Sequence, residues 1–163
     1  MVMKKIKKKS DGELLSRAVE IAAGAIKKGG GPFGAVITRD GEIISEAYNE
    51  VVYLSDPTAH AEILAIRKAC EQTGSHILGD CTLYASCEPC PMCLGAIYWS
   101  GIKKVFYAAN RDDAEKAGFG DKFIYAEMLL DPEKRLIKFH RLKGIDGKEP
   151  FMIWNSYENK IPY

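Results

Sequence analysis

The sequence lacks any long apolar run and any excess of charge of one sign. No stretch approaches the roughly 20 apolar residues that span a bilayer. The basic start, MVMKKIKKKS, has no apolar stretch behind it, which excludes a secretory signal. The 23 Lys and Arg nearly balance the 22 Asp and Glu, so the net charge is only +1. With 47% hydrophobic and 28% charged residues, we expect an ordinary globular protein that makes no membrane contact.

The positive charge is concentrated at the start of the chain. Five lysines fall within residues 4–9, which leaves 18 of the 23 basic residues against all 22 acidic ones. A chain body with four more acidic than basic residues argues against a broad basic surface for nucleic acid. Residues 1–10 are therefore interpreted as a flexible basic tail, although an arm that contacts nucleic acid would have the same composition.

The sequence also lacks a spread-out disulfide framework. It has five cysteines, an odd number, and Cys87, Cys90 and Cys93 lie within seven residues. Together with the missing export signal, this predicts reduced thiols in a cytoplasmic protein. The clustered cysteines are then expected to bind a metal rather than to form disulfides.

The first elements can be placed from apolar spacing and turn residues. A chain of 163 residues is long enough for one domain, which we place at residues 11–163. Apolar residues recur at helical spacing from Asp11, a candidate N-cap, to about Lys28, where three glycines stop the helix. The runs Ala35–Thr38 and Ile43–Ile44 flank an Asp-Gly pair, which predicts a β-hairpin.

The middle of the chain then alternates helices with strands. A helix is expected from Asp56-Pro57 to about Gln72, followed by a strand at 81–85. Pro91 starts a short apolar helix that ends near Gly101, and 104–108 is another strand. This alternation favours parallel pairing of the last three strands, with helices on both faces of an α/β sheet. After Asn110 the pattern weakens and predicts no definite element.

Two helix starts carry the residues with metal chemistry. One is Thr-Ala-His60-Ala-Glu62 and the other is Glu-Pro-Cys90-Pro-Met-Cys93. If both helices begin at one edge of the sheet, their positive ends converge, which favours thiolates and hydroxide there. One imidazole and two thiolates form a three-ligand zinc site with an open fourth position, which is typical of catalytic zinc.

Glu62 is the candidate for proton transfer at such a site. Zinc lowers the pKa of a bound water molecule to about 7. A nearby carboxylate that is not a metal ligand can then move protons between this water and the substrate. Residues two apart do not share a helical face. His60 and Glu62 can both reach the metal only if the site lies over the first turn of the helix.

Three other interpretations of these motifs stay open at this point. Cys87 could complete a closed structural site with His60 and the other two thiols. The triplet of cysteines also begins like a ferredoxin cluster motif, but Ile97 stands where that motif needs its fourth cysteine. A redox dithiol would leave the pairing of His60 with Glu62 unexplained.

The H-x-E and P-C-x-x-C pair is the signature of the zinc nucleobase deaminases, which the chain resembles. Within that superfamily the sequence is most similar to the bacterial guanine deaminases. The resembling stretches are GGPFGAVI (30–37), DPTAHAEILAIRKAC (56–70), SCEPCPMCLGAIYW (86–99), VFYAA (105–109), AGF-D-FIY (117–125) and the terminal Tyr163. The zinc motif identifies the superfamily, whereas the segment around Asp121 and the final tyrosine favour guanine.

The resemblance implies a fold, an assembly and further site residues. It implies a three-layer α/β/α sandwich around a five-stranded mixed sheet, and a homodimer that exchanges its C-terminal segments. Asn49 resembles the amide that hydrogen-bonds the purine, and Asp121 the carboxylate that recognises the base edge. Phe33 and Trp99 resemble pocket walls, and Tyr163 a residue that the partner chain inserts. Taken alone, Phe33 and Trp99 are equally compatible with core packing. Asn49 and Asp121 are compatible with turns, and Tyr163 with a frayed chain end.

The expected activity is zinc-dependent hydrolysis of guanine to xanthine and ammonia, with one Zn²⁺ per chain and a purine base as the small-molecule partner. The alternatives are deamination of cytosine, of a nucleoside such as guanosine, or of adenosine in transfer RNA. An RNA substrate would require a basic face that the acidic body does not offer. A non-catalytic, zinc-stabilised interaction domain is the alternative from another class, and it would have no use for Glu62.

Overall fold

The structure is a computed structural model that describes residues 8–162, so the expected tail is covered only from Lys8 onward. Helix α1 spans Asp11–Ile26. Its N-cap is Ser10, one residue before the expected Asp11. The shift arises from a capping box: Glu13 N donates to Ser10 Oγ, and Ser10 N donates to the Glu13 carboxylate at 2.7 Å.

Strands β1 (Gly31–Arg39) and β2 (Glu42–Asn49) form the expected hairpin. Asp40 and Gly41 both have positive φ, 53° and 82°, which is the backbone that a two-residue turn between twisted strands requires. Strand β3 (Cys81–Cys87) pairs with the other side of β1, also antiparallel. Strand β4 (Lys104–Ala109) pairs with β3 in parallel.

The strand order within residues 8–162 is β2-β1-β3-β4. Parallel pairing of the last three strands is therefore confirmed for β3 and β4 but wrong for β2. The hairpin places β2 at the edge of the sheet, and β1 separates it from β3. The expected fifth strand is also absent from this part of the chain. The residues after β4 form helices and turns instead, beginning with the highly charged α5 (Arg111–Lys116).

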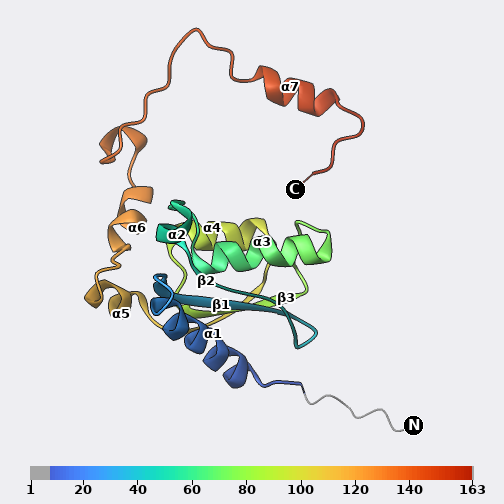
Figure 1. Ribbon diagram of the computed structural model, residues 1–163. Helices are drawn as coiled ribbons and strands as arrows, with labels where there is room; N and C mark the ends of the chain where they lie inside the picture. The colour runs from blue at the N-terminus through green and yellow to red at the C-terminus, as the bar shows by residue number, and fades with distance from the viewer. Residues whose placement is uncertain (1–7, 163) are drawn as a thin grey trace. The chain divides into compact units, whose positions relative to one another are not determined.

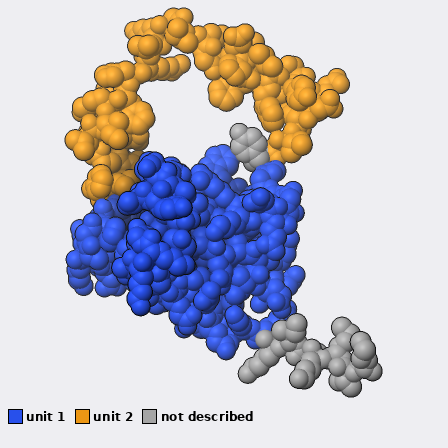
Figure 2. All heavy atoms as spheres, viewed as in Figure 1, with its two compact units in different colours: residues 1–122 blue, residues 123–163 orange. Residues whose placement is uncertain are grey.

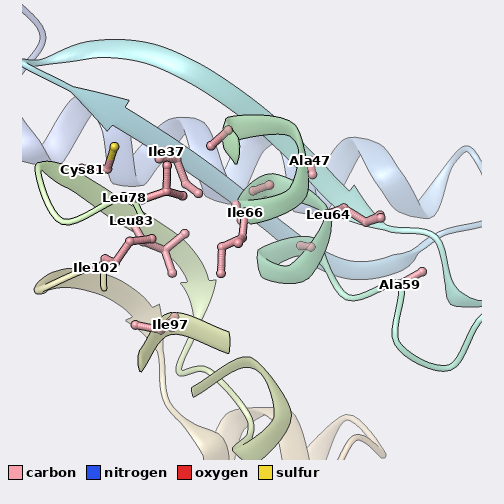
Figure 3. Close-up of a cluster of buried hydrophobic side chains, with 14 residues drawn as sticks. Ile37, Ala47, Ala59, Leu64, Ile66, Leu78, Cys81, Leu83, Ile97 and Ile102 are labelled. Carbon is pink, nitrogen blue, oxygen red and sulfur yellow. The ribbon is translucent and has the colours of Figure 1, made fainter. Parts of the chain in front are cut away.

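Helices cover both faces of the sheet, as expected for a three-layer sandwich (Figure 1). Helix α1 packs on one face through Leu14 and Ala18, which meet Val36 and Tyr84 of the sheet. The larger core lies on the opposite face, beneath α3 (Ala61–Thr73) and α4 (Pro91–Trp99). Figure 3 shows this cluster, which includes Ile37 and Leu83 from the sheet and Leu64 and Ile66 from α3.

The segment between β2 and α3 differs from the expected single helix. A short helix α2 occupies Val51–Leu54, and α3 begins only at Ala61. The Asp56 carboxylate accepts hydrogen bonds from Thr58 N at 2.8 Å and Thr58 Oγ1 at 2.7 Å. These hydrogen bonds form a local turn at the Asp-Pro pair, where the helix was expected to begin. The helix ends at Gly74 (φ 65°), as expected.

The chain divides into two compact units, Met1–Lys122 and Phe123–Tyr163 (Figure 2). The second unit contains most of α6 (Lys122–Met128), a 3₁₀ turn at Pro132–Lys134 and α7 (Glu149–Ser156). Both clusters of buried apolar side chains lie in the first unit. Among the described residues, no helix is long and apolar enough to cross a membrane.

Candidate metal centre

Three side chains with metal-ligating atoms meet where α3 and α4 begin. His60 is the N-cap of α3 and Cys90 is the N-cap of α4, and both have extended backbone angles. Cys93 lies at the third residue of α4, which Pro91 starts. The ligating atoms of the three residues all lie within 4.8 Å of one another. Each helix therefore directs its positive end toward this point.

The distances between these atoms match a tetrahedral zinc site. The sulfurs of Cys90 and Cys93 each lie 3.6 Å from His60 Nδ1. Zinc binds sulfur at about 2.3 Å and imidazole nitrogen at about 2.0–2.1 Å, so tetrahedral angles put the two atoms about 3.6 Å apart. The ligand set and its spacing thus fit one zinc ion, with a fourth position open to water or substrate.

The three groups also interact electrostatically. Hydrogen bonds from Cys93 and from the His60 ring lower the pKa of the Cys90 thiol to about 4. The hydrogen bond with Cys90, together with burial, raises the pKa of Cys93. The hydrogen bond with Cys90 raises the pKa of His60. A cation bound here would replace protons as the positive partner of the two sulfurs.

Glu62 is a buried carboxylate beside these atoms. It is 7% exposed, and burial raises its pKa, with Cys90, His60 and Cys93 among the neighbours that act on it. The difficulty that residues two apart do not share a helical face disappears, since His60 is outside the helix as its N-cap. A buried carboxylate that lies beside the ligand atoms and is not one of the three candidate ligands is placed to move protons to and from a group bound there.

Cys87, the third cysteine of the motif, lies apart from the ligand atoms. Its thiol donates to the carbonyl of Asn110 at 3.5 Å, and burial raises its pKa to about 11. The group of candidate ligands found in residues 8–162 does not include it. The arrangement therefore favours an open three-ligand site over a closed four-ligand one.

Asn49 lies at the end of β2, next to the segment that leads to His60. Glu50 N donates to the Ala59 carbonyl at 3.0 Å, which holds the two segments together. The Asn49 side chain is buried, and its Oδ1 accepts from Val51 N at 3.3 Å. A Cβ at Gly31 would lie 3.0 Å from the same oxygen, so the missing side chain at Gly31 leaves room for the amide.

Phe119, which had no predicted role, contacts Phe33 and lies two residues before Asp121 in the sequence. The Phe33 ring on β1 meets the ring of Phe119 edge to face, with centroids 5.1 Å apart. Two residues after Phe119, Asp121 Oδ1 is buried and has no hydrogen-bond partner among residues 8–162. Burial raises the pKa of Asp121, and the charge of Cys90 raises it further. Asp121 therefore lies within electrostatic range of the ligand cluster.

Trp99, at the other end of α4, is not part of the ligand cluster. Trp99 is 70% exposed and closes α4, nine residues long, so it lies about 12 Å along the helix axis from the end that carries the ligands. Its role as a pocket wall stays a prediction. Tyr163 lies outside the described residues.

Sequence reasoning assigned no role to Phe119, Glu88 or Arg111. Phe119 belongs to a stretch that carried the family resemblance, so its position beside Asp121 was an available signal. Glu88 precedes the Pro-Cys pair of the motif, but its partner Arg111 is 23 residues away. No local pattern links the two residues.

Comparison with known proteins places these features in context. The cytidine and deoxycytidylate deaminase zinc-binding region matches residues 8–109. Guanine deaminase of Bacillus subtilis is 53% identical over 150 residues, which cover 91% of this chain and 96% of that protein. An X-ray structure of guanine deaminase from Bacillus subtilis matches with a TM-score of 0.93 at 51% identity, covering 95% of this chain and 99% of that one. A tRNA-specific adenosine deaminase of Aquifex aeolicus is 48% identical over 95 residues, 58% of this chain and 63% of that protein.

Proposed function

The chain belongs to the cytidine and deoxycytidylate deaminase zinc-binding family, and we propose that it hydrolyses guanine to xanthine and ammonia. The observation that carries the proposal is the similarity to a guanine deaminase over nearly the whole chain. The three-ligand cluster with a buried carboxylate beside it is the chemistry that such a reaction needs.

His60, Cys90 and Cys93 would hold one zinc ion. When bound, zinc lowers the pKa of water to about 7, so a nucleophile is available near neutral pH. Glu62 takes a proton from the attacking water as its oxygen bonds to C2 of guanine. Glu62 delivers this proton to ring N3, then takes the remaining proton from the C2 hydroxyl and gives it to the amino group. The C2–N bond breaks, ammonia leaves and the C2 carbonyl of xanthine remains.

Base recognition is assigned to residues around this centre. Asn49 is proposed to hydrogen-bond the purine through its carboxamide, and Asp121 to accept hydrogen bonds from the base edge. The unpaired buried oxygen of Asp121 supports this assignment, since such an acceptor is costly unless a ligand supplies a donor. The edge-to-face contact between Phe33 and Phe119 supports an apolar wall beside Asp121. Trp99 is retained as a second proposed wall.

The assembly we propose is a homodimer in which C-terminal segments are exchanged and Tyr163 closes the partner's site. Apolar side chains of the second unit support it, because Phe151, Ile153 and Trp154 are at least 41% exposed. Exchange between identical chains would cover them at little cost. The free thiols of all five cysteines support a reducing, cytoplasmic setting.

Deamination of adenosine in transfer RNA is the second candidate, since relatives with that activity match more than half of the chain. The acidic balance outside residues 4–9 argues against it. A non-catalytic zinc domain is disfavoured by Glu62, whose buried carboxylate is costly and has no evident purpose without catalysis.

The test is an ammonia-release assay of the purified, zinc-loaded protein. Its substrates are guanine, adenine, cytosine, guanosine and a transfer-RNA anticodon stem-loop with adenosine at the wobble position. We expect guanine to give the highest kcat/KM by at least about tenfold, which corresponds to 1.4 kcal/mol of transition-state discrimination. Faster turnover of the RNA or of cytosine would reject the proposed substrate. Ammonia release from none of them would reject the activity.

A further inference from the structure

A bidentate contact joins the ligand-bearing turn to the start of α5. Glu88 lies two residues before Cys90, and Arg111 is the first residue of α5. The Arg111 guanidinium donates to one oxygen of the Glu88 carboxylate, and Arg111 N donates to the other at 3.2 Å. The two side chains are 35% and 22% exposed. A carboxylate bound by the side chain and the backbone of one residue is held in a single orientation.

Two more hydrogen bonds strengthen the same junction. Glu88 N donates to the carbonyl of Ala109 at 2.9 Å, and Cys87 Sγ donates to the carbonyl of Asn110 at 3.5 Å. Asn110 in turn caps α5, since its side chain accepts from Asp112 N and Asp113 N. Hydrogen bonds thus join the turn before Cys90 to the turn after β4.

Helix α5 extends this connection to both sides of Asp121. Before it, Phe119 N donates to the Ala114 carbonyl at 2.9 Å. After it, Lys122 Nζ lies 2.7 Å from carboxylate oxygens of both Asp112 and Glu115. The chain is therefore held to α5 two residues before Asp121 and one residue after it. Its buried oxygen has no partner of its own in residues 8–162.

We propose that Arg111, held by Glu88, is a positioning residue for guanine recognition: the pair sets the distance between the Asp121 carboxylate and the metal ligands. The inference rests on the proposed function, because it takes Asp121 as the group that binds the base. A purine is rigid, so the edge held by Asp121 determines where C2 lies relative to the metal. An error of about 1 Å in such a placement costs about 10²-fold in rate.

A double-mutant cycle on the zinc-loaded protein tests this proposal. The four proteins are the parent, Arg111→Ala, Asp121→Ala and the double variant, each assayed for kcat/KM with guanine. We expect Arg111→Ala to lower kcat/KM at least tenfold, mainly through kcat, with zinc still near one per chain. In the Asp121→Ala background the same change should cost less than about twofold, since a residue that acts through Asp121 has nothing left to position.

An arginine that only supports the fold would lower kcat/KM by the same factor in both backgrounds, and that additive result would overturn the proposal. Arg111→Lys keeps the charge and the backbone bond to Glu88 but loses the planar fork, so it should fall between parent and Arg111→Ala. It also replaces Arg111→Ala in the cycle if the alanine variant does not fold.

Arg39 provides a matched control. It is 32% exposed, and its guanidinium pairs with Asp80, with Nη2 donating to Oδ1 at 3.0 Å, at the end of β1 away from Gly31. Arg39→Ala should leave kcat/KM with guanine within twofold of the parent. An effect of Arg39→Ala as large as that of Arg111→Ala would assign both to fold support and overturn the inference. A parent protein that releases no ammonia from guanine would refute the proposed function itself, whereas an active parent with an additive cycle refutes only the role of Arg111.

Discussion

Glu62 is buried and is not one of the three candidate metal ligands. Because its proposed task is to move protons, Glu62→Ala should lower turnover by about 10²–10⁴-fold while zinc stays near one per chain. Ammonia release and metal analysis on the same preparation measure both quantities. Glu71→Ala, an exposed change on the same helix, is the control and should behave as the parent. A zinc-loaded Glu62→Ala protein with near-parental turnover would remove Glu62 from the mechanism.

The cysteines of the motif should separate by metal content. Cys90→Ala and Cys93→Ala each remove a sulfur that lies 3.6 Å from His60 Nδ1, so both should lose zinc and thermal stability. Cys87→Ser removes a thiol that donates to the Asn110 carbonyl and is not one of the three candidate ligands, so this variant should keep its zinc and most of its activity. Loss of zinc from Cys87→Ser equal to that of the other two would indicate a closed, structural site.

Asp121 should determine which base is accepted. A carboxylate accepts hydrogen bonds from the ring N–H and amino group of guanine, whereas adenine has no ring N–H on its Watson–Crick edge. Asp121→Ala should therefore lower kcat/KM for guanine by about 10²-fold and reduce the preference for guanine over adenine. Parallel assays with the two bases measure the preference. An unchanged ratio would show that Asp121 does not recognise the base edge.

At the scale of elements, α1 and β1 depend on a glycine for their close approach. A Cβ at Gly34 would overlap the Ala18 carbonyl oxygen and lie 2.7 Å from Ala22 N, both backbone atoms of α1. Gly34 N also donates to Ser86 Oγ at 3.0 Å, on the strand that leads to the ligand turn. Gly34→Ala should lower the free energy of unfolding by about 1–3 kcal/mol, measured by urea titration.

Gly24 is the matched control for this prediction, because it lies on α1 with no atom within 4 Å of an added Cβ. Gly24→Ala should stabilise the protein by about 0.5–1 kcal/mol, through the better helix propensity of alanine. If Gly34→Ala proved as stable as Gly24→Ala, the helix and strand would not be in contact as described.

Local sequence patterns predicted where some helices and strands begin and end, but not others. The Asp40-Gly41 hairpin and the end of α3 at Gly74 depend on the backbone freedom of single residues, and both were predicted. The start of α3 was not, since Asp56 binds Thr58 rather than opening a helix. Asp-Pro is compatible with both conformations, and the neighbouring sequence does not distinguish them.

At the scale of the whole molecule, the proposed exchange of C-terminal segments has a direct test. Deleting residues 161–163 should reduce turnover sharply while sparing zinc, and the active parent should sediment as a dimer. A Glu62→Ala chain refolded together with a tail-deleted chain should then regain activity. One of the two sites in each mixed dimer would combine an intact Glu62 with an intact partner tail. Averaged over all sites, the restored activity should therefore be about a quarter of the parent value after random pairing, and about half for purified mixed dimers.

Each variant refolded alone is the control for this complementation. No restored activity, in samples where mixed dimers are shown to form, would mean that the tail acts within its own chain or not in catalysis. The apolar side chains of the second unit would then need another cover, such as a different protein surface.

The sequence alone predicted the ligand cluster and several local elements, among them the β-hairpin and the end of α3. His60, Glu62, Cys90 and Cys93 stand within two short segments, so their roles follow from ligand chemistry and from the helix starts that the neighbouring residues encode. The family resemblance extended the prediction to Asn49 and Asp121. These inferences need only a few residues of context, since capping, turns and ligand spacing are local properties of the chain.

The tertiary structure alone decided which distant segments meet. It placed β1 between β2 and β3, set Phe33 against Phe119, and brought Glu88 to Arg111 across 23 residues. It also left the Asp121 oxygen buried without a partner in the described chain. Such contacts depend on how apolar faces pack and which strand edges are free, and these are properties of the whole fold rather than of any segment.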